Sequence, residues 1–167
     1  VVAPTAGFHF SRELMKRMEI KGIDSAYVTL HSGLGNFRAI EVEDLTKHKM
    51  DSEQMEINEQ NANLINKTKE KENKVCIVGT TTMKAVETAA ITGNRVKVYS
   101  GWSNKFIFPH YNFDIADAMI TNFHPPLSSM LMMVSAFGGY DLIMEAYKHA
   151  VEKEYKFLTY GDAMLII

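Results

Sequence analysis

The stretch Ala118–Gly139, AMITNFHPPLSSMLMMVSAFGG, decides the fold, because it holds a strand, a polar turn and the start of a helix in one continuous unit. Its first four residues are apolar or β-branched and predict a buried strand. Pro125 and Pro126 neither donate to a strand ladder nor continue a helix, so the chain turns there. The apolar run over 130–137 then predicts a core helix, which the closing pair of glycines ends.

Polar side chains gather where this strand ends and the helix begins. Asn122 and His124 follow the strand, and Ser128 or Ser129 precedes the helix. Ligands of open α/β sheets bind at such junctions, because free helix amides and the helix dipole face the crevice. We therefore expect these four side chains to converge on one site. The alternative is that the serines only cap the helix, which is their common use.

A second strand–helix junction lies at residues 75–87, VCIVGTTTMKAVE, where three consecutive threonines follow a strand and a glycine. If this strand is parallel to the first one, Thr80 and Thr81 lie at the same end of the sheet as Asn122 and His124. Such a junction suits a carboxylate, a sugar hydroxyl or a phosphate. Alternatively, one threonine is the helix N-cap and the others are incidental.

A glycine turn, Gly33 and Gly35, follows a predicted strand over 26–31 that ends in His31. Glycines of this kind let the backbone approach a ligand closely, as phosphate loops require. The turn lacks the third glycine and the immediate helix of a nucleotide-binding loop, so a plain turn explains it equally well. Another histidine, His9, lies in the turn-forming start of the chain.

The remaining pattern predicts helices after the caps Ser11 and Asn58 and over 140–155. It also predicts strands at 54–57, 96–99, 105–109 and near the C-terminus. The strand at 75–78, the helix after it and the strand at 96–99 predict a right-handed βαβ unit. We therefore expect an α/β fold with a mixed, largely parallel sheet flanked by helices.

Composition limits the classes of function. The 167 residues predict one domain, and 46% hydrophobic residues are enough for a proper core. A net charge of -2 argues against nucleic-acid binding by bulk electrostatics and leaves only a local basic face. The single cysteine, Cys76, excludes an internal disulfide and a cysteine-cluster metal site, as expected in a reducing cytoplasm.

The ends of the chain and its apolar runs give two further expectations. No run approaches the ~20 apolar residues that span a bilayer, and no signal peptide is visible. The chain begins with Val1 rather than Met and opens on a loop. We therefore expect a fragment of a longer protein.

Several motifs, in order along the whole chain, resemble the S-adenosylmethionine:tRNA ribosyltransferase-isomerases of queuosine biosynthesis. The matching strings are APTAGFHF (3–10), VTLH (28–31) with GLG (33–35) and FR (37–38), VGTT (78–81), TNFH (121–124) and YGDAMLI (160–166). Members of that family are longer, and they contain an N-terminal part and an inserted β-barrel domain that are absent here. The resemblance implies that residues 1–167 are the C-terminal part of the α/β catalytic domain.

Some positions depart from the family pattern, which has Ser, Arg, Thr, Gly and Lys there. These positions are Thr82, Lys84, Asn36, His110 and Leu127, respectively. Lys84 keeps the positive charge of arginine but loses the planar fork that grips a carboxylate at two points. The missing cation at Leu127 argues against anion binding by that turn. A lineage variant and a paralogue with an altered substrate both fit these departures.

The resemblance implies an unusual use of S-adenosylmethionine as a co-substrate, without a metal. Its ribosyl part is transferred to the aminomethyl group of a deazaguanine base in the tRNA anticodon and is isomerised. Adenine and methionine leave, and the product is epoxyqueuosine. We expect a cytoplasmic monomer that acts on tRNA and does not bind a membrane.

This chemistry requires a base for the proton beside the sulfonium and an acid for the departing adenine, and histidine suits both near neutral pH. His9, His31 and His124 each lie in a matching motif, and His124 is favoured, with Asp162 as the competing candidate. Thr80, Thr81 and Asn122 are expected to hold hydroxyls or the methionine end of the cofactor, and the remaining cofactor-binding candidates are Gly33, Gly35, Ser128 and Ser129. The alternative is that the histidines satisfy backbone groups in a polar core.

Two other functions fit the sequence. One is a non-catalytic module, whole or truncated, that binds S-adenosylmethionine or a nucleoside. The other is an ordinary methyltransferase, which is disfavoured because no GxGxxG-like loop follows an early strand.

Overall fold

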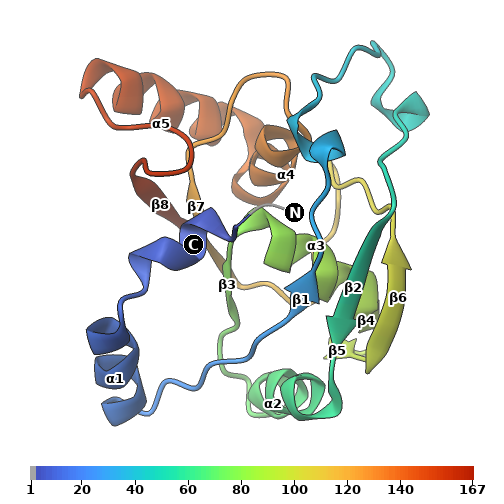
Figure 1. Ribbon diagram of the computed structural model, residues 1–167, viewed down its shortest axis with the longest axis vertical. Coiled ribbons are helices and arrows are strands. Elements are labelled where there is room, and N and C mark those ends of the chain that lie inside the picture. The colour runs from blue at the N-terminus through green and yellow to red at the C-terminus, as the bar shows by residue number, and fades with distance from the viewer. Residues whose placement is uncertain (1–2) are drawn as a thin grey trace.

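The computed structural model consists of helices and three small sheets (Figure 1). It describes residues 3–167, except the side chains of Asn36 and Phe37. The departure at Asn36 therefore lies outside the described side chains. The α-helices are α1 (Arg12–Ile20), α2 (Glu59–Glu70), α3 (Thr80–Ala89), α4 (Ser129–Gly138) and α5 (Tyr140–Glu152). Short 3₁₀ turns are η1 (Thr5–His9), η2 (Leu34–Phe37) and η3 (Leu45–Lys47). The predicted α/β class is confirmed.

The strands pair in two three-stranded sheets and one hairpin. The first sheet has the order β1 (Thr29–Leu30), β2 (Glu53–Ile57) and β6 (Tyr99–Ser103), and it is antiparallel. The second has the order β3 (Cys76–Val78), β7 (Ala118–Asn122) and β8 (Ala163–Ile166). The hairpin is β4 (Ala90–Ile91) with β5 (Arg95–Val96).

Fewer strands pair in parallel than the sequence predicted. Among the described strands, β3 and β7 form the only parallel pair, with Cys76 opposite Ala118 and Val78 opposite Ile120. The expected βαβ unit over 75–99 is wrong, because the chain after α3 folds back as the β4–β5 hairpin and then joins β2 through β6. The parallel partner of β3 is therefore β7, which follows a much longer connection.

The strand expected at 105–109 is also absent from the described structure. Residues 105–108 form a loop that buries Ile107 in the core without a ladder partner. Phe106 and Phe108 pack against each other with ring centroids 4.9 Å apart. This loop therefore gains its burial from side-chain packing rather than from strand pairing.

Three predicted helix caps are confirmed. The side chains of Ser11, Asn58 and Ser128 accept hydrogen bonds from backbone amides in the first turns of α1, α2 and α4. Helix α3 differs, because its N-cap is Gly79 at φ 89° and no side chain caps it. The alternative that one threonine is this N-cap is wrong, since the three threonines form the first turn itself.

Helix α3 lies between the two three-stranded sheets and is the centre of the core (Figure 1). It contacts β1, β2 and β6 on one side and β3 on the other. Met83, Ala85, Val86 and Ala89 are at most 1% exposed, so the helix is buried around most of its circumference. Its charged side chains consequently need partners inside the protein.

Lys84 finds its partner on β2. Its Nζ lies 2.7 Å from Oε2 of Glu53, and both side chains are less than 5% exposed. Oε1 of Glu53 accepts a hydrogen bond of 2.8 Å from the amide of Gly33. The buried ion pair therefore ties α3, β2 and the turn after β1 together.

Glu87 fixes the loop that leads into β7. Its carboxylate accepts hydrogen bonds from the amides of Asp114, Ile115 and Ala116 at 3.1–3.3 Å, and from the hydroxyl of Tyr111. The side chain is 1% exposed. A carboxylate thus replaces strand pairing for these backbone groups.

Replacing Lys84 by Met removes the ammonium group from a buried carboxylate, and we expect the free energy of unfolding to fall by about 3 kcal/mol. The double variant Glu53→Gln/Lys84→Met should recover part of that loss, because no charge is then buried. Lys16→Met is the control, since Lys16 pairs with Glu19 at 65% and 70% side-chain exposure and should change stability by less than about 1 kcal/mol. Urea denaturation measures all three, and equal losses for Lys84→Met and Lys16→Met would contradict the assignment.

His110 has φ 75°, a left-handed conformation that suits the glycine expected at this position. Because side chains with Cβ are strained in this region, His110→Gly should leave stability unchanged or raise it by up to about 1 kcal/mol. Asn104 is exposed and is not in this conformation, so Asn104→Gly should instead lower stability by about 0.5 kcal/mol. Thermal unfolding of both variants tests this; a larger loss for His110→Gly than for Asn104→Gly would refute it.

Candidate functional site

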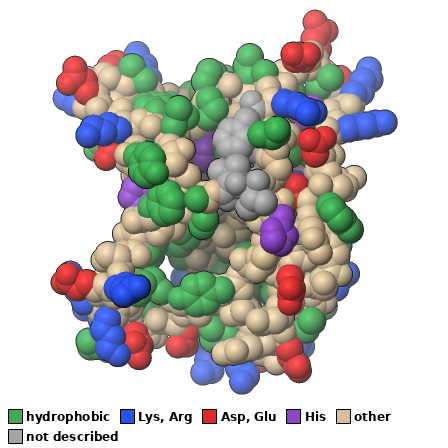
Figure 2. All heavy atoms as spheres, viewed as in Figure 1, with side chains coloured by type: hydrophobic (Ala, Val, Ile, Leu, Met, Phe, Trp, Pro, Cys, Tyr) green, Lys and Arg blue, Asp and Glu red, His purple; other side chains and the backbone are tan. Residues whose placement is uncertain are grey.

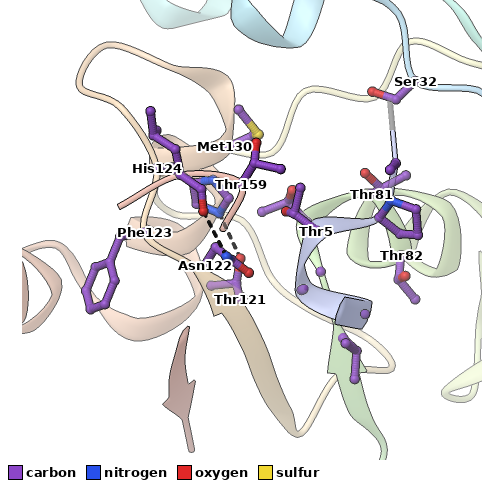
Figure 3. Close-up of a pocket in the computed structure, with 18 of the residues that line it drawn as sticks. Thr5, Ser32, Thr81, Thr82, Thr121, Asn122, Phe123, His124, Met130 and Thr159 are labelled. Carbon is purple, nitrogen blue, oxygen red and sulfur yellow. Dashed lines mark hydrogen bonds between the residues drawn. The ribbon is translucent and has the colours of Figure 1, made fainter. Parts of the chain in front are cut away.

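A cavity of about 240 Å³ lies at the carboxyl ends of the parallel strands β3 and β7 (Figure 3). Four parts of the chain line it, together with Ser32 and Met130: residues 3–7, 78–82, 121–125 and 158–159. Because β3 and β7 are parallel, the expectation that the 79–82 and 122–124 junctions meet at one end of the sheet is confirmed.

The first turn of α3 supplies the backbone amides on one side of the cavity. Residues 80–82 precede the first helical hydrogen bond, which runs from the amide of Met83 to the carbonyl of Gly79. Their N–H groups therefore have no partner within the helix, and Gly79 offers no side chain to them. This turn is suited to a carboxylate or another anionic group.

The side chains around the cavity are hydroxyl-rich and uncharged apart from the ionisable ring of His124. Among the described residues that line it, none is an Asp, Glu, Lys or Arg. The hydroxyl groups belong to Thr5, Ser32, Thr80, Thr81, Thr82, Thr121 and Thr159. A ligand here meets hydrogen-bonding groups without a fixed opposing charge, so only the α3 amides favour an anion.

His124 lies on the opposite side, at the end of β7 (Figure 3). Its Nε2 is 2.7 Å from Oγ1 of Thr121, and its backbone amide donates to the hydroxyl of Tyr147 at 2.9 Å. The side chain is 8% exposed. These contacts fix the ring, and no described residue hydrogen-bonds to its Nδ1.

Burial lowers the pKa of His124 to about 4, because the protein interior disfavours the charged imidazolium. The ring is therefore neutral at pH 7. A neutral imidazole in a cavity can accept a proton from a bound ligand without first losing one to solvent.

Asn122 joins both ends of the chain at the cavity. Its Oδ1 is 3.2 Å from Nε2 of His9, and its Nδ2 donates to the carbonyl of Leu158 at 2.9 Å and of Gly161 at 3.4 Å. The residue is 2% exposed. His9 is itself exposed and does not line the cavity, so it is connected to the site through Asn122.

Two other candidate catalytic residues lie outside the lining. His31 is exposed, although the next residue, Ser32, lines the cavity. Asp162 is exposed, and its Oδ2 accepts the amide of Lys156 at 2.7 Å. In this structure Asp162 closes the loop before β8 rather than facing the cavity.

The glycines of the 33–35 turn also lie outside the lining. The amide of Gly33 is bound by Glu53. A Cβ atom on Gly35 would collide with the carboxyl group of Asp51. Glycine at position 35 therefore lets the backbone approach Asp51 of the same chain, rather than a ligand.

The two serines at the start of α4 do not converge with Asn122 and His124. Ser128 is the N-cap of α4, and its Oγ also donates to the carbonyl of Pro125 at 2.8 Å. Ser129 lines a much smaller neighbouring cavity of about 20 Å³, together with Lys84. Capping thus accounts for Ser128. Leu127 is 58% exposed and does not line the larger cavity either.

The structure adds residues that sequence reasoning missed. Thr5, Thr82 and Thr159 line the cavity, and two of them could have been found from their positions: Thr5 lies within the APTAGFHF motif, and Thr82 completes the threonine run. Thr159 directly precedes the YGDAMLI motif. Glu53 was missed although it is in phase with Met55 and Ile57, so the period of a strand places it on the buried face.

No group of three or more His, Cys, Asp or Glu side chains within the described residues is arranged to hold a metal ion. Across the same residues, every helix is too short or too polar to cross a bilayer.

Comparison with known proteins places this geometry in context. Residues 1–166 match the family described as queuosine biosynthesis protein. A Phocaeicola vulgatus protein named S-adenosylmethionine:tRNA ribosyltransferase-isomerase is 62% identical to this chain. The match covers 100% of this chain and 48% of the relative. A protein of the same name from Halothermothrix orenii is 49% identical, also over 100% of the chain and 49% of the relative. The chain thus spans about half the length of the curated relatives it matches.

The fold is also similar to a solved structure. The crystal structure of S-adenosylmethionine tRNA ribosyltransferase from Thermotoga maritima superposes with a TM-score of 0.80 at 37% sequence identity. The match covers 97% of this chain and 51% of the other.

The lowered pKa of His124 predicts a specific pH dependence of stability. An unfolded histidine binds a proton below about pH 6.5, whereas folded His124 does so only near pH 4. The unfolded state therefore holds more protons between these values, and lowering the pH from 6.5 to 4 should cost about 3 kcal/mol of stability. His124→Gln cannot titrate, so its stability should fall less over the same range. Denaturation of both proteins between pH 7 and 4 measures this, and parallel curves would contradict it.

Proposed function

This chain belongs to the queuosine biosynthesis protein family, and from that membership we propose that it is part of an S-adenosylmethionine:tRNA ribosyltransferase-isomerase. Residues 1–167 correspond in this proposal to the C-terminal part of the α/β catalytic domain. An N-terminal part and an inserted β-barrel domain complete the enzyme. The names of the relatives and the shared fold support this.

The proposed reaction transfers the ribosyl moiety of S-adenosylmethionine to the aminomethyl-deazaguanine base of a tRNA and isomerises it. Epoxyqueuosine forms, and adenine and methionine are released. S-adenosylmethionine is a co-substrate, and no metal takes part. The reaction takes place in the cytoplasm, where the tRNA is found, with the enzyme as a monomer.

The cavity between the ends of β3 and β7 is the observation that carries the proposal. The amides of the first turn of α3 are suited to the methionine carboxylate of S-adenosylmethionine. The threonine hydroxyls, among them those of Thr80 and Thr81, are suited to its ribose hydroxyls. None of the described residues that line the cavity is a Lys or Arg, which would repel the sulfonium.

The volume of the cavity indicates how much of the co-substrate it holds. About 240 Å³ is less than the roughly 300–1,000 Å³ of typical small-molecule sites. The cavity therefore takes one portion of S-adenosylmethionine, and the other portion extends beyond its rim, where the tRNA base arrives.

His124 is the favoured base in this proposal. The positive sulfonium acidifies the adjacent carbon, so a neutral imidazole held in the cavity is able to take its proton. Thr121 orients the ring through Nε2, which leaves Nδ1 for the substrate. The protonated ring has a low pKa and is then a ready acid for the departing adenine.

The other candidates have different positions relative to the cavity. His9 acts in the proposal through Asn122, to which it is hydrogen-bonded. His31 and Asp162 remain candidates that require the substrate to extend beyond the lining, because both are exposed outside it.

Release of adenine from S-adenosylmethionine in the presence of tRNA carrying the modified base tests the function. The full-length protein should release adenine only when this tRNA is present. His124→Ala should lower the turnover number by about 10²–10⁴-fold, as expected for a lost general base. His124→Gln, which keeps a hydrogen-bonding side chain beside Thr121, should be equally impaired.

Two results would count against the proposal. Full turnover by His124→Ala with unchanged co-substrate affinity would exclude His124 as the base. Binding of S-adenosylmethionine without adenine release by the full-length protein would favour the non-catalytic binding module.

A further inference from the structure

Two aromatic side chains from opposite ends of the chain form an exposed stacked pair beside the cavity. The rings of Phe8, in η1, and Tyr160, in the loop before β8, have centroids 6.1 Å apart and planes inclined by 13°. Phe8 is 51% exposed and Tyr160 is 87% exposed. Their chain neighbours Gly7 and Thr159 line the cavity, so the pair stands at its rim.

The loop over 156–162 holds Tyr160 in this exposed position. The side chain of Asn122 donates to the carbonyls of Leu158 and Gly161. Asp162 closes the loop through the amide of Lys156, and any side chain at Gly161 would collide with the backbone of Lys156 and Phe157. A tight, multiply anchored loop thus presents the ring of Tyr160 to solvent.

Strain in the same loop supports a functional reading. Leu158 has φ 69°, a left-handed conformation that costs energy for a residue with a Cβ atom. The amide of Leu158 donates to the carbonyl of Phe123 at 3.1 Å, which holds the loop against the end of β7. The backbone of this loop is therefore anchored to Asn122 and to the end of β7.

An exposed aromatic ring on an anchored loop is suited to stacking against a nucleobase. Unpaired RNA bases are commonly bound in this way, because every base has a π-face. A small ligand would instead bury about 70–90% of its surface in a pocket. A ring that is 87% exposed therefore fits a base that belongs to a larger molecule.

We propose that Phe8 and Tyr160 form a stacking platform for an unpaired RNA base next to the nucleotide whose base arrives at the rim of the cavity. This inference rests on the proposed function, because it requires an RNA substrate. Arg12 and Lys156 lie four residues from Phe8 and Tyr160 along the chain, and both are exposed. They are available for phosphate contacts. In the view of Figure 2, Lys and Arg side chains lie mainly around the periphery of the molecule.

Binding of an anticodon stem-loop RNA to the full-length protein tests the platform. Tyr160→Ala should raise the dissociation constant for the RNA by about 5- to 150-fold, the loss expected for one stacked base. Tyr160→Phe keeps the ring and should bind within about threefold of the wild type. Tyr140→Ala is the control, because Tyr140 is also largely exposed, at 61%, but lies at the start of α5 and outside the cavity lining.

Three outcomes would overturn the platform. Unchanged RNA affinity in Tyr160→Ala and Phe8→Leu would show that no base stacks there. Weaker binding of S-adenosylmethionine with unchanged RNA binding would assign the rings to adenine. A loss of thermal stability with unchanged RNA binding would show that another part of the full-length chain covers them.

The same experiment separates this inference from the proposed function. Adenine release by the wild type in the presence of the modified tRNA tests the function alone. If the wild type releases adenine and Tyr160→Ala binds the RNA as tightly as the wild type does, only the platform is refuted. If the wild type neither binds the RNA nor releases adenine, both proposals fail.

Discussion

Burial of α3 between two sheets is the constraint on which the rest of the structure depends. A helix buried around most of its circumference tolerates charged side chains only if each has a partner, and Lys84 and Glu87 have theirs in Glu53 and in the loop before β7. These contacts fix the direction of the helix. Its first turn is therefore held at the ends of β3 and β7, where its amides and the residues after β7 form one cavity.

The local features of the fold were largely predictable, because they follow from short-range chemistry. Ser11, Asn58 and Ser128 cap helices as their positions indicated. The two strand–helix junctions also meet at one end of the sheet as expected, because β3 and β7 are parallel. Asn122, His124, Thr80 and Thr81 could thus be assigned to one cavity from the sequence.

Long-range pairing was not predictable, because strand propensity does not specify a partner. The strand expected at 96–99 was assigned to the same unit as β3, but the chain turns back through the β4–β5 hairpin and β6 pairs with β2. The roles of Ser129 and Gly35 depended likewise on distant neighbours, the smaller cavity and Asp51. The role of Asp162 depended on how its own loop closes onto Lys156. Thr159 was missed as a lining residue because only folding brings the C-terminal loop to Asn122.

The most direct test of this account is a crystal structure of the full-length protein with bound S-adenosylmethionine. In that structure the methionine carboxylate should accept hydrogen bonds from the amides of residues 80–82, and the carbon beside the sulfur should lie within reach of His124. Binding of the co-substrate away from the ends of β3 and β7, with this cavity empty, would contradict the account.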